Sequence, residues 1–286
     1  MVSMKEFKEK VAVITGAGSG IGLSIAERCA LEGMKVVLAD IDEHFLRRAK
    51  RKMEKLGASF LTIQTDVSKL SDMQILAEKT FEHFGAVHLL FNNAGVSNPK
   101  YFWNYTLNDW KWQIGVNLWG VIYGIHVFMP IMQKQDTECH IINTASIEGL
   151  LSGSGPGGAI YGLTKHAIVS LSESMRTELT QTKSKINVSV LCPGWVSSKI
   201  FFSDTHRQEE YRDSDDETFD DLKIEDSAAK FKAIKDVSPP MACEDVAEIV
   251  FKAIRRKKFY ILTHSDQLLK AGVELRMGEI LRAFGK

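Results

Sequence analysis

A tyrosine and a lysine four residues apart are the first candidates for chemistry in this chain. Tyr161 and Lys165 lie in a stretch with helical periodicity, so both side chains project from one helix face. Free tyrosine has a pKa of about 10, but a nearby ammonium favours the phenolate and lowers that pKa. The pair is therefore a candidate acid–base couple, although an isolated pair at this spacing is more often two surface residues.

A glycine-rich turn is a candidate site for phosphates. A strand-like run at 11–15 leads into it, and a helical pattern follows. Glycines let a backbone approach a pyrophosphate closely, and a helix start offers free N–H groups and a positive dipole end. Asp40 ends the next strand pattern, 18 positions past Gly22, where an acid binds ribose hydroxyls. Dinucleotide binding is thus predicted for Gly16, Gly18, Ser19, Gly20, Ile21 and Gly22.

Two further polar residues occupy positions typical of a site. Ser146 follows the strand pattern at 140–144, where a hydroxyl faces the ligand crevice and can donate to an oxygen that gains negative charge. Ser152 and Ser154 are alternatives, but neither follows a strand. Asn117 is an amide inside an otherwise apolar helix, so it needs a hydrogen-bond partner and is either structural or part of the site.

The elements that must position these residues alternate between short apolar runs and longer amphipathic stretches. The candidate strands are 11–15, 35–40, 59–64, 88–92, 140–144, 185–192 and 259–262. The candidate helices are 20–32, 43–56, 70–84, 106–134, 158–182, 244–256 and 266–284. This pattern predicts an α/β fold: one domain over residues 1–286, with a doubly wound, Rossmann-type parallel sheet of about seven strands and helices on both faces.

The one break in composition is the segment at about 201–240, which we interpret as an acidic lid beside the substrate crevice. From Ser203 to Asp226 it carries eleven acidic residues against three Lys or Arg. Such a field would repel polyanionic substrates such as acyl carriers or CoA esters. The alternative is a solvated face with no influence on binding.

Composition argues against several classes of protein. The 36 basic residues balance 36 acidic ones, which argues against nucleic-acid partners. The four cysteines lack metal-ligand or redox spacing, which predicts no metal site and reduced thiols in the cytoplasm. The N-terminus has charges where a secretory signal needs an apolar run. Residues 112–133 carry no formal charge, but polar residues, a proline and three glycines interrupt them, so we expect a buried helix rather than a membrane span.

Four motifs in combination resemble those of the short-chain dehydrogenase/reductase family. They are TGAGSGIG at 15–22, NNAG at 92–95, YGLTK at 161–165 and PGWVSS at 193–198. The first matches the family's TGxxxGxG, the third its YxxxK, and the fourth is similar to its PGxVxT. Their order and intervals cover about residues 9–200, and the combination is specific although each motif alone is not.

The resemblance implies a catalytic set of Asn117, Ser146, Tyr161 and Lys165. Tyr161 would be the base in alcohol oxidation and the acid in carbonyl reduction, Ser146 would polarise the substrate oxygen, and Lys165 would tune Tyr161 and bind ribose. Asn117 would hold a water in a proton relay. The 15 positions from Ser146 to Tyr161 exceed the usual family interval. The other implied contacts are Asp66 and Val67 at adenine, Asn93 and Ala94 beside the cofactor, and Val196 and Ser198 at the nicotinamide carboxamide.

The expected activity is hydride transfer between NAD and a secondary alcohol or ketone. NAD is expected over NADP because a 2′-phosphate would meet the Asp40 carboxylate. Phe102, Trp103, Tyr105 and Trp195 suggest an apolar or alicyclic substrate, although core packing explains aromatic residues equally often. The alternatives are epimerase, dehydratase or enoyl-reductase chemistry on the same fold, and a non-catalytic cofactor-sensing protein.

The expected assembly is a homotetramer or dimer. The helix at 106–134 is apolar over too many faces for a single contact with the sheet. We therefore expect it to pack across a subunit interface with the helix that follows Tyr161, as the resemblance implies.

Overall fold

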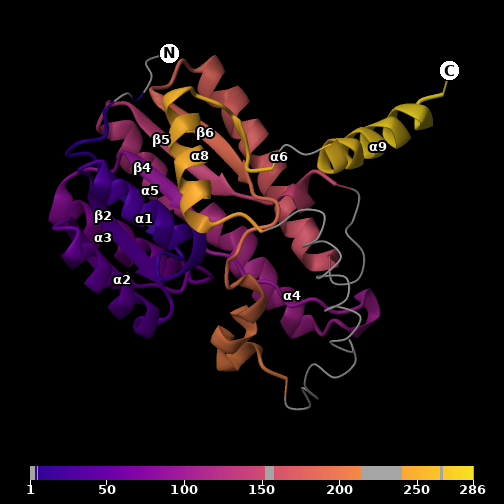
Figure 1. Ribbon diagram of the computed structural model, residues 1–286, viewed down its shortest axis with the longest axis horizontal. Coiled ribbons are helices and arrows are strands. Elements are labelled where there is room, and N and C mark those ends of the chain that lie inside the picture. The colour runs from indigo at the N-terminus through magenta and orange to yellow at the C-terminus, as the bar shows by residue number, and fades with distance from the viewer. Residues whose placement is uncertain (1–3, 5, 152–157, 214–239, 265–266, 286) are drawn as a thin grey trace.

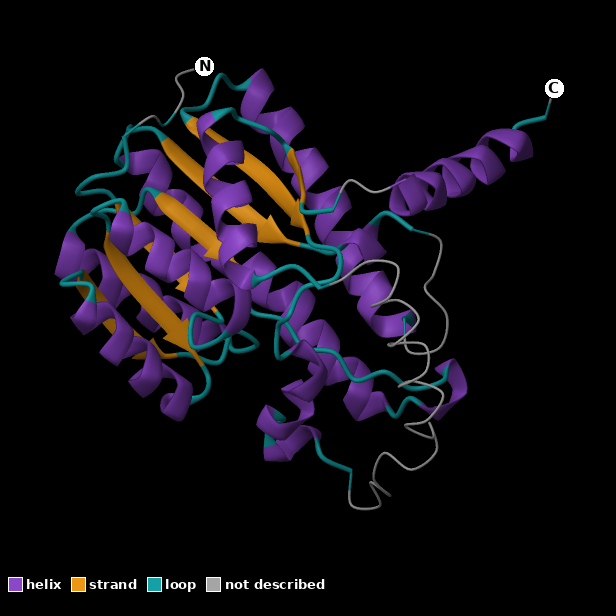
Figure 2. Ribbon diagram, viewed as in Figure 1, coloured by secondary structure: helices purple, strands orange, loops and turns teal. Residues whose placement is uncertain are grey.

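Seven parallel strands form one sheet in the computed structural model, which describes residues 4, 6–151, 158–213, 240–264 and 267–285. The strand order is β3-β2-β1-β4-β5-β6-β7, and every neighbouring pair is parallel. The strands are β1 (Val11–Thr15), β2 (Lys35–Asp40), β3 (Ser59–Gln64), β4 (Leu89–Asn92), β5 (Cys139–Thr144), β6 (Ile186–Cys192) and β7 (Tyr260–Leu262). The α/β fold expected from the sequence is confirmed (Figure 2).

Helices cover both faces of this sheet (Figure 1). One face carries α1 (Gly20–Leu31), α2 (Glu43–Lys55) and α8 (Cys243–Arg255). The other face carries α3 (Leu70–Phe84), α4 (Leu107–Ile114), α5 (Gly120–Lys134) and α6 (Ala159–Gln181). The last helix, α9 (Gln267–Ala283), projects away from the sheet toward the C-terminus (Figure 1).

The strands contribute side chains to two separate apolar layers. In β1, Ala12 and Ile14 belong to the layer with α1 and α8, whereas Val11 and Val13 belong to the layer with α3 and α5. All four are at most 2% exposed. Burial on both faces is why the strand sequences read as continuous apolar runs instead of alternating polar and apolar residues.

Each predicted element end either coincides with the observed end or differs from it by one residue, which is within the normal spread for element ends. The helix expected at 106–134 differs from the prediction in its type of helical structure. It is observed as α4 and α5 joined by a π-helical turn, Gly115–Trp119. Single π turns inside helices often occur at functional positions, and Asn117 lies at the centre of this one.

The helix from Leu107 to Lys134 is, within the described chain, the one segment long and apolar enough to cross a membrane by length and composition. In this fold it contacts α3 and β4, and its Trp112 and Phe128 side chains lie in the core of the sheet. Only 33% of its apolar window is buried, however. One side of this helix is therefore left without cover by the rest of the described chain.

The strand order creates a crevice at the carboxyl ends of β1 and β4. From β1 the chain proceeds to β2 and β3 on one side, and from β4 it proceeds to β5 and β6 on the other. Ligands of doubly wound sheets bind at such a switch point. Gly16, Asn93 and Ser146 follow the carboxyl ends of β1, β4 and β5, so three of the predicted motifs meet there.

Part of the predicted acidic lid is described. Residues 199–213, which we call the strap, contain two short 3₁₀ helices, η4 (Ile200–His206) and η5 (Glu209–Tyr211). The strap lies between α2 and α4 (Figure 1). Residues 214–239 of the predicted lid lie outside the described residues.

The close approach of α5 to β4 yields a prediction for stability. A Cβ on Gly124 would lie 2.1 Å from Oδ1 of the buried Asn92, whose amide donates to Asn143 Oδ1 at 2.9 Å. Gly124→Ala should therefore lower the free energy of unfolding by about 2 kcal/mol, because that buried amide must move or lose its partner. Urea unfolding followed by circular dichroism measures this.

The control is the same substitution at Gly162 in α6, where an added Cβ meets nothing within 4 Å. Gly162→Ala should raise the free energy of unfolding by up to about 1 kcal/mol, the difference in helix propensity between the two residues. Equal stability of Gly124→Ala and the wild type would contradict the packing described here.

Candidate active site

The glycine turn is shaped so that side chains cannot replace its glycines. Gly16 and Gly20 have φ of +64° and +53°, a region that L side chains rarely adopt. A Cβ on Gly18 would lie 2.8 Å from Asp40 Oδ2, and one on Gly22 would lie 2.1 Å from the Gly16 carbonyl oxygen. The turn therefore presents bare backbone to the crevice, as close approach of a ligand requires.

The start of α1 is suited to an anion. The Ser19 side chain at the N-cap makes no hydrogen bond to the first turn, and no acidic residue lies in that turn. The N–H groups and the positive end of the helix dipole are thus not neutralised by the chain itself. A pyrophosphate fits this turn by both shape and charge.

Asn93 and Ala94 support the turn from below. The Thr15 hydroxyl accepts from the backbone N–H of Asn93 at 2.9 Å and of Ala94 at 3.1 Å, and the Asn93 amide donates to the Thr15 carbonyl at 3.0 Å. A Cβ on Gly16 would lie 2.9 Å from Ala94 Cα. These contacts lock the end of β1 to the end of β4, so Asn93 and Ala94 fix the floor of the crevice.

Asp40 lies beside the glycine turn, as the sequence pattern predicted. Its carboxylate accepts from the backbone N–H of Gly18 at 2.8 Å and of Asp42 at 3.0 Å. Burial raises the pKa of Asp40, and these two hydrogen bonds oppose the rise. The side chain is thus an oriented acceptor next to the turn, where a ribose attached to the bound pyrophosphate would lie.

Asp66 and Val67 follow the carboxyl end of β3. The Asp66 carboxylate accepts from both the N–H and the hydroxyl of Ser68, at 3.0 and 2.6 Å, and from the Gln208 amide at 2.9 Å. Val67 is 7% exposed, and a Cβ on Gly120 of α5 would lie 2.8 Å from its Cγ2. Both residues border the far end of the crevice, two strands from the glycine turn.

Tyr161 and Ser146 meet at the near end. Ser146 follows β5 with 7% exposure, and its hydroxyl accepts from the Glu148 N–H at 3.2 Å. Burial raises the pKa of Tyr161 to about 12, while a hydrogen bond with the Ser146 side chain lowers it. The sequence predicted that Lys165 lowers the pKa of Tyr161. In the protein without cofactor this pKa is raised instead, because burial of the phenol is the largest influence on it.

Lys165 is buried beneath Tyr161. Its ammonium is 5.3 Å from the centre of the Tyr161 ring and donates to the Thr144 carbonyl at 3.0 Å. The residue is 2% exposed, and burial lowers its pKa to about 8. Lysine and tyrosine thus project from one face of α6, as their spacing predicted, but the ammonium contacts the strand end rather than the phenol.

Asn117 joins this group from the π turn. Its amide donates to the Val96 carbonyl at 3.0 Å and to the Thr164 hydroxyl at 3.2 Å, and its oxygen accepts from the Val96 N–H at 2.8 Å. A Cβ on Gly95 would lie 3.5 Å from both Asn117 Oδ1 and Lys165 Nζ. The predicted structural partner exists, and all four predicted catalytic residues converge on this part of the crevice.

The last two predicted contacts lie after β6. Val196 pairs with Met241 through an isolated bridge, and the Ser198 N–H donates to the Val196 carbonyl at 2.7 Å. A Cβ on Gly20 would lie 3.5 Å from Ser198 Cβ. The PGWVSS motif therefore returns to the start of α1 and closes the crevice on the side of the glycine turn.

Several site residues were missed by the sequence analysis. Cys192 ends β6 beside Lys165, and burial raises the pKa of its thiol to about 12. Burial also raises the pKa of Glu148, whose charge acts on Tyr161. His206 and Gln208 of the strap reach the crevice from far along the chain. Of these residues, only Cys192 could have been found from the sequence, because it directly precedes the PGWVSS motif at 193–198.

The described residues contain no group of three or more His, Cys, Asp or Glu able to hold a metal ion. The four cysteines, all described, are free and buried. The polar groups of the crevice are thus hydroxyls, amides, backbone N–H groups, an ammonium and carboxylates.

Known proteins resemble this chain over most of its length. The family model for short chain dehydrogenase matches residues 10–209. A CLA biosynthesis dehydrogenase/reductase from Lactiplantibacillus plantarum is 35% identical over 92% of this chain and 91% of its own. A 1-deoxy-11-beta-hydroxypentalenate dehydrogenase from Streptomyces exfoliatus is 30% identical over 91% of this chain and 85% of its own. A short-chain dehydrogenase/reductase from Burkholderia phymatum, solved in complex with NAD, has a TM-score of 0.89 and 42% identity over 97% of this chain and 96% of its own.

Burial of Lys165 predicts a pH-dependent stability for the protein without ligand. Its pKa falls from 10.5 to about 8 on folding, so between these values the unfolded chain binds more protons and the free energy of unfolding rises with pH. Lys165→Met should be more stable than the wild type by about 2 kcal/mol at pH 7, the cost of the shift less the lost hydrogen bond.

The advantage of the Lys165→Met variant should shrink toward zero as the pH approaches 10.5, the value for the unfolded chain. Urea unfolding of both proteins across this range measures the difference directly. A difference that stays constant with pH would show that the ammonium is not desolvated in the fold.

Proposed function

Because the chain belongs to the short-chain dehydrogenase/reductase family, we propose that this oxidoreductase transfers a hydride between NAD and a secondary alcohol or its ketone. The observation that carries the proposal is the convergence of Tyr161, Ser146, Lys165 and Asn117 beside a turn suited to a pyrophosphate. Bound NAD supplies the hydride acceptor and, in its oxidised form, a positive charge. The chain supplies the proton chemistry at the substrate oxygen.

Tyr161 is the proposed acid–base group. Its phenol and the Ser146 hydroxyl are hydrogen-bonded to each other, so a substrate oxygen placed between them contacts both. In oxidation the Tyr161 oxygen takes the hydroxyl proton, and in reduction it returns a proton to the carbonyl oxygen. Ser146 stabilises the negative charge that develops on that oxygen.

Lys165 is the group that makes tyrosine chemistry possible near neutral pH. With a pKa of about 12, Tyr161 alone is too weakly acidic, and the Lys165 ammonium lies 5.3 Å from the centre of its ring. A second positive charge, that of the oxidised cofactor, favours the phenolate further. Lys165 Nζ and Asn117 Oδ1 both lie next to Gly95, and we propose that the proton leaves the site between these two residues.

Both amide hydrogens of Asn117 are used by Val96 and Thr164. We propose that a relay water is held by the backbone of the π turn instead of by this amide. The amide itself positions the turn against the segment that follows β4.

The proposed substrate class rests on the name of a relative. The family relative from Streptomyces exfoliatus is named a 1-deoxy-11-beta-hydroxypentalenate dehydrogenase. For this chain we propose an apolar or alicyclic alcohol. An NAD-reduction screen over secondary alcohols, including sterols, terpenoid alcohols and alicyclic diols, tests this. Product analysis with NADH separates the redox reaction from epimerase, dehydratase and enoyl-reductase chemistry.

We also propose a homo-oligomer, with the outer side of the helix at Leu107–Lys134 in the subunit interface. Trp119 is 46% exposed on this helix, with its ring centre 5.3 Å from that of the tilted Tyr123 ring, and Leu163 of α6 is 47% exposed. A second copy would cover these side chains. The same interface would cover the exposed side of this helix, since only 33% of its apolar window is buried in one chain.

Replacement of the Tyr161 hydroxyl is the direct test of the mechanism. On the best alcohol from the screen, Tyr161→Phe should lower kcat by about 10²–10⁴-fold, because general acid–base catalysis is lost. Its dissociation constant for NAD, from isothermal titration calorimetry, should change by less than about threefold, since no cofactor contact beyond the phenol is removed. Tyr123→Phe, on α5, is the matched control and should retain wild-type kcat; a Tyr161→Phe variant with wild-type kcat would refute the mechanism.

Cofactor preference is proposed from Asp40, whose carboxylate would accept from both ribose hydroxyls of NAD. With NADP one of these is replaced by a phosphate, and like charges about 4 Å apart cost roughly 4 kcal/mol at an effective dielectric of 20. The ammonium of Lys199 in the strap lies 4.3 Å from the centre of the nearby Phe45 ring, and its charge offsets part of this repulsion. Half of the cost still gives at least about tenfold discrimination.

Steady-state kinetics with both cofactors should therefore favour NAD by at least about tenfold in kcat/KM. Asp40→Ala should narrow the gap mainly by improving kcat/KM with NADP, because the repulsion is relieved. Equal efficiency of the unmutated protein with NAD and NADP would refute the preference.

A further inference from the structure

The strap bridges the two loops at the far end of the crevice. His206 Nδ1 lies 3.0 Å from Asp42 Oδ2 in the loop after β2, and Gln208 donates to Asp66 Oδ2 in the loop after β3. Glu210 lies 3.5 Å from Lys69, at the start of α3. Residues 206–210 therefore run from the carboxyl end of β2 to that of β3.

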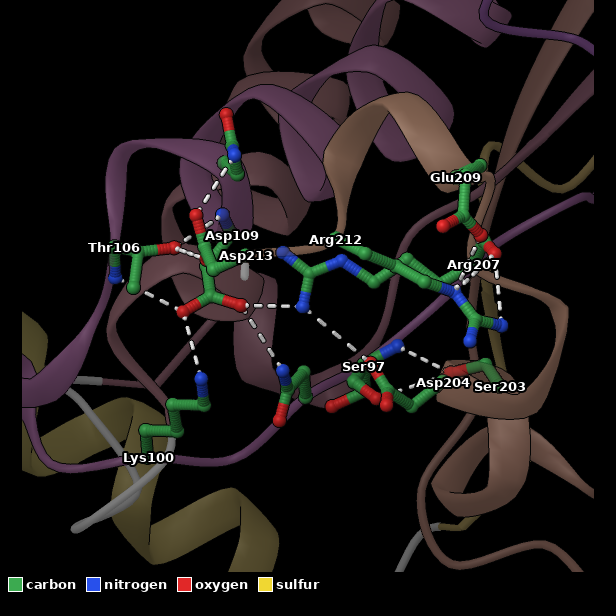
Figure 3. Close-up of polar contacts among 12 residues, drawn as sticks. Ser97, Lys100, Thr106, Asp109, Ser203, Asp204, Arg207, Glu209, Arg212 and Asp213 are labelled. Atoms are coloured by element: carbon green, nitrogen blue, oxygen red, sulfur yellow. Dashed lines mark hydrogen bonds and ion pairs between the residues drawn. The ribbon is translucent and has the colours of Figure 1, made fainter. Parts of the chain in front are cut away.

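A buried charge cluster fixes the strap in this position (Figure 3). Asp109, which is 0% exposed, accepts from Arg207 at 2.8 Å and from Lys100 at 3.0 Å. The Ser97 N–H donates to the Ser203 hydroxyl at 2.9 Å, and that hydroxyl donates to the Ser97 carbonyl at 3.0 Å. Breaking such buried pairs is costly, so the residue after Arg207 is held in one place.

The same end of the crevice is where the base of a bound dinucleotide must lie. The pyrophosphate fits at the start of α1, after β1, and Asp40 at the end of β2 lies beside the glycine turn. The sheet order β3-β2-β1 continues this line to the end of β3. The Thr65 N–H donates to the Asp40 carbonyl at 2.9 Å, so Asp66 is the next polar group along it.

Only one of the two polar groups of the Gln208 amide makes a hydrogen bond within the described residues. A carboxylate only accepts hydrogen bonds, so the NH₂ group must be the end that faces Asp66. The carbonyl oxygen, Oε1, is shielded from solvent and has no hydrogen-bond partner within the described residues. A buried carbonyl without a partner is destabilising unless a ligand supplies the donor.

The Asp66 carboxylate is also partly committed. Oδ1 accepts twice from Ser68, whereas Oδ2 accepts from Gln208 and has Lys69 Nζ at 3.6 Å. Among the described side chains that join the strap to the loop after β3, the remaining lone pair of Asp66 Oδ2 and the Gln208 carbonyl oxygen can still accept. A pair of acceptors on two hydrogen-bonded side chains suits a ligand group with two hydrogens on one nitrogen.

We propose that Gln208 reads the purine of the cofactor, with its Oε1 accepting one hydrogen of the exocyclic amine of adenine. The role rests on the proposed function, because it requires a bound adenine dinucleotide. A 6-oxopurine presents an oxygen at the same position, which meets the Gln208 carbonyl and the Asp66 carboxylate with no hydrogen to donate. Gln208 is thus a specificity-determining residue for aminopurines, delivered by a strap far from the glycine turn in sequence.

The test compares NAD with nicotinamide hypoxanthine dinucleotide, which carries an oxygen in place of the exocyclic amine and a hydrogen on the adjacent ring nitrogen. Dissociation constants for both are measured by isothermal titration calorimetry in the wild type and in Gln208→Met, which keeps the length of the side chain. The Gln208→Met change should weaken NAD binding by about three- to tenfold and leave the hypoxanthine analogue within about twofold. The preference for adenine should fall accordingly.

The matched control is Gln64→Met, because Gln64 also lies at this sheet edge but donates to the Ile41 carbonyl at 3.0 Å on an exposed surface. It should change neither constant. Equal weakening of both dinucleotides by Gln208→Met, or no change in either, would overturn the role of Gln208 while leaving NAD binding intact. A wild type that binds neither dinucleotide would instead overturn the proposed function, and the role of Gln208 with it.

Discussion

The proposed site depends on one buried positive charge, the ammonium of Lys165, and on its hydrogen bond to the Thr144 carbonyl. Desolvation opposes its charge strongly enough to lower its pKa to about 8, and one strong hydrogen bond, to the Thr144 carbonyl, supports it in the described structure. A fold retains such a cost where the charge is used. Here the charge lies 5.3 Å from the centre of the Tyr161 ring, and burial raises the pKa of that tyrosine to about 12. The proposed mechanism requires positive charge to lower this pKa.

The parallel sheet brings the other polar residues of the site next to Lys165 and Tyr161. The carboxyl ends of β1, β4, β5 and β6 meet at one edge of the sheet. Residues that follow these strands therefore lie close together although they are far apart in the sequence. Glycines at the closest approaches leave room in the crevice, and Asn117 lies in the π turn between α4 and α5. The buried Asp109 cluster holds the strap in place through the ion pair with Arg207 (Figure 3).

Much of this was predictable from the sequence because the relevant signals are local. The glycine turn and the Tyr161–Lys165 pair are set by spacing within one turn or helix, and apolar runs located every strand to within one residue. The direction of the Tyr161 pKa was not predictable, since it depends on how much of the phenol the rest of the fold covers. The contacts of Gln208 with Asp66 and of Arg207 with Asp109 were equally hidden, because they join residues 142 and 98 positions apart.

The measurement that tests the central claim most directly is the titration of Tyr161 with and without NAD. Ultraviolet difference absorbance of the phenolate, taken between the wild type and Tyr161→Phe, isolates this one group. Without NAD, its pKa should be raised, near the value of about 12 set by burial. On saturation with NAD it should fall by several units, to below about 9, as the ammonium and the cofactor charge act together. A pKa that stays above 10 with NAD bound would contradict the assignment of Tyr161 as the acid–base group.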